Sequence, residues 1–189
     1  MEPNKSLLLI INGAPGSGKT HLSRRLSKEL QLPLLSKDDI KEGISDVLGV
    51  KDRAWSKKLG GASFDALFVL LERQLEAGIS CIVETAFIPR FNTPRFLELK
   101  ERYGCHPFEI YCYAQSSTLA ERFNQRVTTG TRHPVHTDGL VTLQAMQAVL
   151  DSGKYGILGI GSTVVEVDTT NFEKVDFTGL VEIIKSSQR

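Results

Sequence analysis

Hydrophobic residues divide the chain into short apolar runs and longer stretches with helical spacing, and the two kinds alternate. The apolar runs, which predict strands, cover residues 6–12, 33–35, 79–84, 108–113 and 162–168. Apolar residues three or four apart predict helices over about 18–30, 54–77, 94–103, 117–127, 138–151 and 177–185. Strands that alternate with helices are typical of a parallel sheet covered by helices on both faces. We expect an α/β fold in which residues 1–189 form a single domain.

Another helix is expected directly after Ser36, a residue type that commonly caps helices. Its buried side is predicted to consist of four apolar residues, Ile40, Ile44, Val47 and Leu48. Gly60 and Gly61 mark a point at which the long helix that follows could be interrupted.

Composition narrows the classes of function. The 189 residues carry a net charge of +1, which argues against a strong non-specific affinity for nucleic acid. No apolar run is long enough for a membrane span, and the first five residues do not resemble a signal sequence. The three cysteines, Cys81, Cys105 and Cys112, lack metal-ligand spacing and fit a reducing compartment. We expect a cytoplasmic protein without a membrane or nucleic-acid partner, acting as a monomer or a homodimer.

Residues 13–20 match the phosphate-binding pattern G-x-x-x-x-G-K-[ST] and lie between a predicted strand and a predicted helix. Glycines in such a loop let successive backbone amides turn toward a phosphate. Lys19 can reach the β- and γ-phosphates, and the Thr20 hydroxyl can hold Mg²⁺. The loop consists of Gly13, Ala14, Pro15, Gly16, Ser17, Gly18, Lys19 and Thr20. It predicts binding of a nucleoside triphosphate.

Acidic residues follow the second predicted strand, where ligands of open α/β sheets bind. Asp38 could accept a proton from an acceptor hydroxyl, and Lys41 could pair with a phosphate or with Asp38. Alternatively, Asp38 and Asp39 are acids in a first helical turn that the helix dipole stabilises.

Two further strand ends carry polar residues. Glu84 and Thr85 end the third strand, where they could reach Mg²⁺ through water, bind the acceptor, or cap the next segment. Asp168 and Thr169 end the fifth strand, where they could contact the adenine base or form a plain polar turn.

The segment at about 128–137, which we name the lid, is polar and rich in helix breakers, and we interpret it as a mobile loop. Arg132, together with Arg122 and Arg126 on the preceding helix, could stabilise charge on a transferring phosphoryl group. The alternative for any one arginine is a solvated charged face. His133 and His136 could shape the lid or touch a substrate.

Together the phosphate loop, the element S-K-D-D-I-K, the strand ending at Glu84-Thr85 and the lid sequence T-R-H-P-V-H resemble small P-loop kinases. The resemblance is to the zeta-toxin, chloramphenicol-phosphotransferase and polynucleotide-kinase group, and most closely to bacterial AAA-type ATP-binding proteins labelled as predicted kinases. It implies a three-layer α/β/α sandwich with strand order 2-3-1-4-5. It also implies Asp38 as the base, Lys41 as its companion, and Arg126 and Arg132 as phosphate clamps.

The leading hypothesis is an ATP- and Mg²⁺-dependent kinase that transfers the γ-phosphate to a hydroxyl of a small molecule. In this group the third strand usually ends in Asp, so magnesium here is expected to rest mainly on Thr20, the phosphates and water. The alternatives are a polynucleotide 5′-hydroxyl kinase and a non-catalytic module that responds to nucleotide. Near-neutral charge weighs against the first, and Asp38 against the second, because a switch needs no base.

Overall fold

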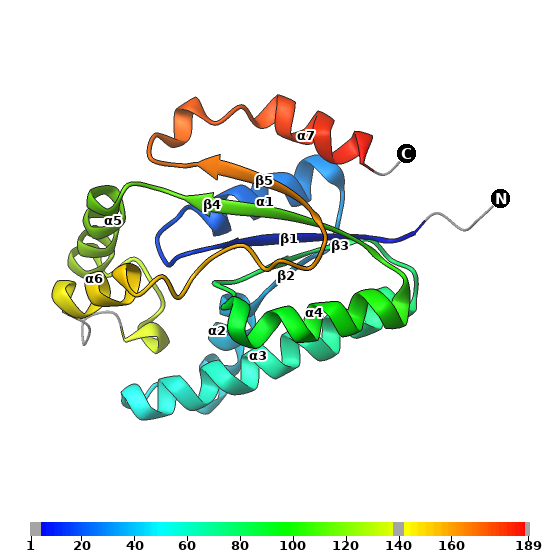
Figure 1. Cartoon of the computed structure of the whole chain (residues 1–189). Helices are drawn as coiled ribbons and strands as arrows, with labels where there is room; N and C mark the ends of the chain where they lie inside the picture. The colour runs from blue at the N-terminus through cyan, green and yellow to red at the C-terminus, as the bar shows by residue number, and fades with distance from the viewer. Residues whose placement is uncertain (1–4, 138–141, 188–189) are drawn as a thin grey trace.

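The computed structural model describes residues 5–137 and 142–187 and contains a five-stranded parallel sheet (Figure 1). Its strands are β1 (Leu7–Gly13), β2 (Leu34–Ser36), β3 (Cys81–Glu84), β4 (His106–Tyr113) and β5 (Thr163–Asp168). Their order is β2-β3-β1-β4-β5, and every neighbouring pair is parallel. The predicted P-loop fold and its strand order are therefore confirmed.

Helices cover both faces of the sheet. The helices are α1 (Lys19–Leu30), α2 (Lys37–Leu48), α3 (Arg53–Glu76), α4 (Pro89–Tyr103), α5 (Ser116–Thr129), α6 (Leu143–Asp151) and α7 (Phe177–Ser186). Short 3₁₀ turns are η1 (Pro134–His136) and η3 (Phe172–Lys174). Side chains of β1 alternate between a core with α1 and α7 and a core with α3 and α4 (Figure 1). Among the described residues, no helix has the length and hydrophobicity to cross a bilayer.

Three of the predicted helices need comment. Helix α4 begins at Pro89 rather than Pro94, because Pro suits a first helical position and the Asn92 side chain accepts the Ile88 amide there at 2.7 Å. Helix α3 continues through Gly60 and Gly61 without a break. Of the helix predicted over 138–151, residues 138–141 lie outside the described residues, and α6 covers Leu143–Asp151.

The predicted buried face of α2 is confirmed only in part: Ile40 is partly buried and packs against the core with α3 and α4, but the residues toward the end of the helix do not follow the prediction. Val47 is 83% and Leu48 is 52% exposed, whereas Lys41 and Ser45 are buried. The reason is that this part of α2 packs against α3 and the lid through polar groups. The Lys41 ammonium donates to the Ser56 hydroxyl at 2.8 Å, and that hydroxyl donates to the carbonyl of Val135 in the lid.

Candidate functional site

A cavity of about 650 Å³ lies at the carboxyl ends of the strands, where open α/β sheets bind their ligands. It is lined by predicted residues from the phosphate loop, α2, β3, α5 and the lid. These are Pro15, Gly16, Gly18, Lys19, Thr20, Asp38, Glu84, Thr85, Arg122, Arg126 and Arg132. Folding therefore brings together most of the site residues that the sequence suggested.

The phosphate loop is held in a conformation that requires glycine. Gly13, Gly16 and Gly18 have φ angles of 140°, 87° and 77°, and a Cβ on Gly13 would lie 2.1 Å from the Cys112 carbonyl oxygen. The Lys19 ammonium donates to the Ala14 carbonyl at 2.9 Å, which folds the side chain back over the loop. Burial lowers the pKa of Lys19. A bound phosphate would add negative charge beside this buried cation, which the Glu84 and Asp38 carboxylates compensate only in part.

Asn12, which the sequence analysis did not single out, anchors the base of the loop. Its Oδ1 accepts the amides of Gly13 at 2.7 Å and Phe87 at 3.0 Å. Its Nδ2 donates to Glu109 at 3.1 Å and to the Gly156 carbonyl at 2.9 Å. A lone polar residue in an otherwise apolar strand was the available signal.

A hydroxyl and a buried carboxylate meet beside the loop. Thr20 Oγ1 donates to Glu84 Oε1 at 3.3 Å, and Ser36 Oγ donates to Glu84 Oε2 at 3.1 Å. Glu84 is 4% exposed, and burial raises its pKa. Within the described ranges, no group of three or more His, Cys, Asp or Glu side chains could hold a metal. Thr20 and Glu84 offer the hard oxygens that Mg²⁺ prefers, so they fit a magnesium ion that also binds phosphates and water.

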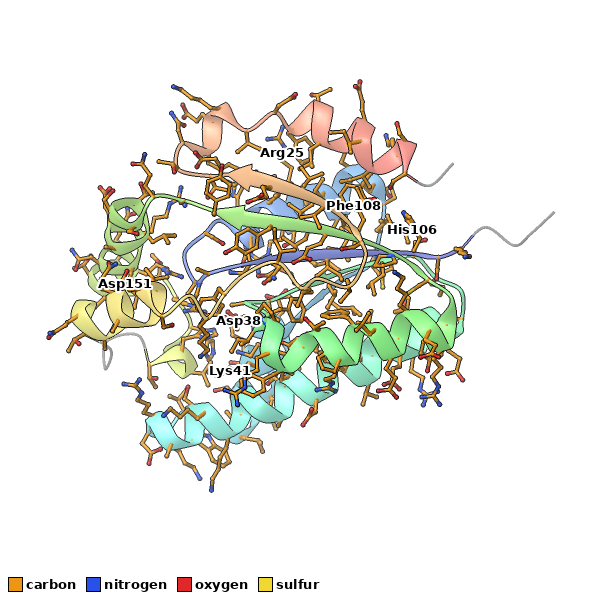
Figure 2. The ribbon with its side chains drawn as sticks, in the orientation of Figure 1. Arg25, Asp38, Lys41, His106, Phe108 and Asp151 are labelled. Carbon is orange, nitrogen blue, oxygen red and sulfur yellow. The ribbon has the colours of Figure 1, made fainter. Side chains whose placement is uncertain are left out.

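Asp38 lies between two cations at the opposite side of the cavity. Its carboxylate contacts Arg132 Nη2 at 2.6 Å and Lys37 Nζ at 3.0 Å. Burial would raise the pKa of Asp38, but the two cations outweigh it and hold the pKa well below its usual range. Lys41 does not line the cavity; Figure 2 shows it farther from the sheet than Asp38, on the side of α3.

The lid is docked along one face of α2. Three acids spaced four residues apart on this helix meet three basic residues of the lid. The pairs are Asp38–Arg132 at 2.6 Å, Glu42–His136 at 2.7 Å and Asp46–His133 at 3.0 Å. Val135 is fully buried between them, so the segment interpreted as a mobile loop has a defined anchorage.

Two residues predicted to contact the nucleotide, Arg122 and Thr169, form hydrogen bonds with the backbone of the phosphate loop. Arg122 donates to the carbonyls of Gly16 at 3.1 Å and Thr169 at 2.6 Å. The buried Thr169 hydroxyl lies 2.9 Å from the Ser17 carbonyl oxygen. Arg122 also lines the cavity, but Thr169 does not. The exposed Asp168 side chain accepts the Thr170 amide and lies outside the cavity too.

Some cavity residues were missed by sequence reasoning. They include Lys37, Phe64 and Tyr155. Of the two lid histidines that the sequence suggested, His136 lines the cavity and His133 lies outside it. Lys37 was signalled only by its neighbour Asp38. No local pattern could place Tyr155, because its position follows from the bond between Asn12 and the adjacent Gly156.

The fold and the phosphate loop define a P-loop protein of kinase-like fold. A family profile described as "AAA domain" matches residues 8–151, and the chain belongs to that family. The crystal structure of a candidate kinase from Chloroflexus aurantiacus J-10-fl is 33% identical, with a TM-score of 0.87. That match covers 97% of this chain and 98% of the other.

More distant structures share the fold. A gluconokinase from Sinorhizobium meliloti 1021 is 15% identical, with a TM-score of 0.57 over 98% of this chain and 91% of the other. A sugar kinase from Janibacter sp. HTCC2649 is 14% identical, with a TM-score of 0.56 over 96% and 93%. No curated protein matches the chain significantly.

Proposed function

We propose that this protein is an ATP- and Mg²⁺-dependent kinase that phosphorylates a hydroxyl of a small molecule. The proposal would place it with the zeta-toxin, chloramphenicol-phosphotransferase and polynucleotide-kinase group. One observation carries the proposal: the phosphate loop, the carboxylate of Asp38 and the guanidinium of Arg132 line a single cavity. Phosphoryl transfer needs these three kinds of group, for donor binding, acceptor orientation and charge stabilisation.

At the donor end, the loop amides and Lys19 would bind the β- and γ-phosphates, whose negative charge would stabilise the Lys19 ammonium. Thr20 and Glu84 would hold the magnesium ion, directly or through water. When bound, magnesium neutralises charge on the phosphate oxygens. Arg126 and Arg132 would stabilise the charge of the transition state.

At the acceptor end, Asp38 would accept a hydrogen bond from the reacting hydroxyl and orient it toward the γ-phosphate. Apolar side chains of Phe64, Ala86 and Ile88 form part of the wall, beside the polar groups of Thr85 and Tyr155. A cavity of about 650 Å³ suits small-molecule ligands rather than an extended polymer.

The test measures magnesium-dependent conversion of ATP to ADP with a panel of acceptors: antibiotics, sugars, nucleosides, nucleotide sugars and a 5′-hydroxyl oligonucleotide. An acceptor that raises turnover and gains one phosphate establishes the kinase and names its class. We expect Asp38→Asn to lower this rate by on the order of 10²-fold, because the reacting hydroxyl loses the carboxylate that orients it. Asp39→Asn is the matched control, because Asp39 pairs with exposed Arg24 outside the cavity.

Other results would contradict the proposal. An oligonucleotide acceptor with a steep salt dependence would identify a polynucleotide kinase instead. The protein could also bind ATP without turnover on any acceptor and retain a protein partner only when ATP is present. That result would identify a nucleotide-responsive binding module.

A further inference from the structure

Two histidines of the lid pair with carboxylates of α2, but their second ring nitrogens differ. His133 uses both nitrogens: Nε2 meets Asp46 at 3.0 Å, and Nδ1 accepts the Val135 amide at 3.1 Å. His136 Nε2 meets Glu42 Oε1 at 2.7 Å, and Nδ1 has no hydrogen bond to any described residue. Only His136 therefore has a ring nitrogen available to a ligand.

The available nitrogen of His136 belongs to a cavity residue. The side chain is 5% exposed and lines the cavity together with Asp38 and Arg132. Nδ1 is not among the fully buried polar atoms without a partner, so it keeps some accessible surface. An ionised Glu42 can only accept, so Nε2 carries the hydrogen and Nδ1 presents a lone pair.

Asp38 is badly placed to take a proton itself. Its two oxygens are held by Arg132 and Lys37, which stabilise the ionised carboxylate. A carboxylate held so firmly in its charged form can orient a hydroxyl but is a weak proton acceptor.

We propose that His136 accepts the proton of the acceptor hydroxyl through Nδ1, with Glu42 as the positioning residue that fixes its ring. The inference rests on the proposed kinase function. In the step, the acceptor O–H bond breaks and its proton moves to Nδ1, while its oxygen forms a bond to the γ-phosphorus. The bond from that phosphorus to the β,γ-bridging oxygen breaks, ADP leaves, and the imidazolium returns its proton to water.

The charges around His136 suit this task. Burial lowers the pKa of His136, and the cations Arg132 and Lys41 act in the same direction, against Asp38 and Glu42. The imidazole is therefore neutral and ready to accept a proton at pH 7. Once it is protonated, the carboxylates of Glu42 and Asp38 face the new positive charge.

The first test compares the pH dependence of kcat in wild type, His136→Gln and His133→Gln. The probe is MgATP with the acceptor that the panel identifies, or with water as acceptor in the slow hydrolysis of ATP. The wild-type rate should fall at low pH as His136 becomes protonated. His136→Gln should lower the rate by about 10²-fold and should no longer show this fall at low pH, the acid limb of the profile. His133→Gln removes the other contact of a lid histidine with α2 and should keep the acid limb of the pH profile.

The second test does not depend on turnover. Nitrogen-15 NMR of the imidazole rings should show His136 with hydrogen on Nε2 and none on Nδ1 at pH 7. Glu42→Gln should change this tautomer balance, whereas Asp46→Asn should leave the His136 signals in place. A doubly protonated His136 ring at pH 7, or hydrogen on Nδ1 alone, would overturn the inference.

The outcomes separate the two proposals. Phosphate transfer by wild type with an unchanged acid limb in His136→Gln removes the role of His136 and leaves the kinase standing. Absence of transfer to every acceptor, including water, removes the kinase and with it the proton step.

Discussion

The two ends of the cavity are built in different ways. The phosphate loop is one continuous stretch whose shape depends on backbone conformation, with Gly13 packed against the Cys112 carbonyl. The proposed acceptor end is assembled from side chains on α2 and on the lid, and Asp38 and Arg132 are 94 residues apart in the chain. The donor end is thus preformed, whereas the acceptor end depends on charges that salt, pH and ligands can shift.

The contacts of the lid with α2 are also weaker than the packing of the phosphate loop. The Asp38–Arg132 and Asp46–His133 pairs are partly exposed, and such pairs contribute about 0–1 kcal/mol each. An extra atom that clashes with the backbone of the phosphate loop should cost more free energy than the loss of one such pair, because the packed loop cannot relax around it. We therefore expect that changes in salt, pH or sequence can release the lid from α2 while the phosphate loop keeps its structure.

The largest effect should come from Lys19→Met. Loss of the ammonium should lower kcat for ADP formation by on the order of 10³-fold, because it removes a preorganised charge from the γ-phosphate. Burial lowers the pKa of Lys19, so its charged form is penalised in the folded protein, and the variant should keep or raise the melting temperature. Turnover within a few-fold of wild type would show that the loop does not bind a reacting phosphate.

Gly13→Ala tests the backbone side of the comparison. The new Cβ would lie 2.1 Å from the Cys112 oxygen, so we expect the free energy of unfolding to fall by about 3 kcal/mol. Gly60→Ala is the control, since it lies in α3 with open space around its Cβ and should stabilise by about 0.5–1 kcal/mol. Urea unfolding measures both, and equal stability of the two variants would contradict a rigid loop.

Two buried carboxylates should respond oppositely to amide substitution. Glu109 accepts only N–H donors, from Asn12 and Leu158, so Glu109→Gln turns an amide hydrogen toward them and should cost about 1–3 kcal/mol. Glu84 accepts hydroxyls, which can turn around, so Glu84→Gln should keep or raise stability. The same variant should require more magnesium for turnover, because it would weaken the proposed magnesium site.

The stability of the protein should depend on pH through Glu84 and Glu109, because burial raises the pKa of both carboxyls. Ionisation is therefore unfavourable in the folded state, and its cost is present above the raised pKa and disappears as pH falls through it. The stability advantage of Glu84→Gln over wild type should shrink on acidification. Thermal unfolding of both proteins over a range of pH measures this difference. An advantage that grows on acidification would contradict an unfavourable ionisation of Glu84 in the folded protein.

The smallest effect on stability should come from Asp46→Asn at the outer end of the lid. Asp46 is 69% exposed, so the free energy of unfolding should change by less than about 0.5 kcal/mol. Amide hydrogen exchange in the described part of the lid should nevertheless become faster, because one of its contacts with α2 is weakened. Unchanged exchange rates would show that Val135 and Arg132 suffice to hold the lid.

Periodicity predicted the strands and most helices, because buried faces repeat every two or about 3.6 residues. It failed in part at α2, where Val47 and Leu48 of the expected apolar stripe are exposed but Lys41 and Ser45 are buried. A pattern of apolar residues assumes that each helix packs on the hydrophobic core. The part of α2 that carries these two residues packs on α3 and the lid instead, through the Lys41–Ser56 hydrogen bond.

The sequence by itself determined the phosphate loop, since glycine positions, Lys19 and Thr20 act through local backbone geometry that eight consecutive residues encode. Only the tertiary structure decided which side chains face Asp38. Arg132 and Lys37 contact it, Lys41 turns toward Ser56, and His136 enters the cavity while His133 does not. These choices depend on how the lid packs against α2, and contacts between segments so far apart leave no spacing in the sequence.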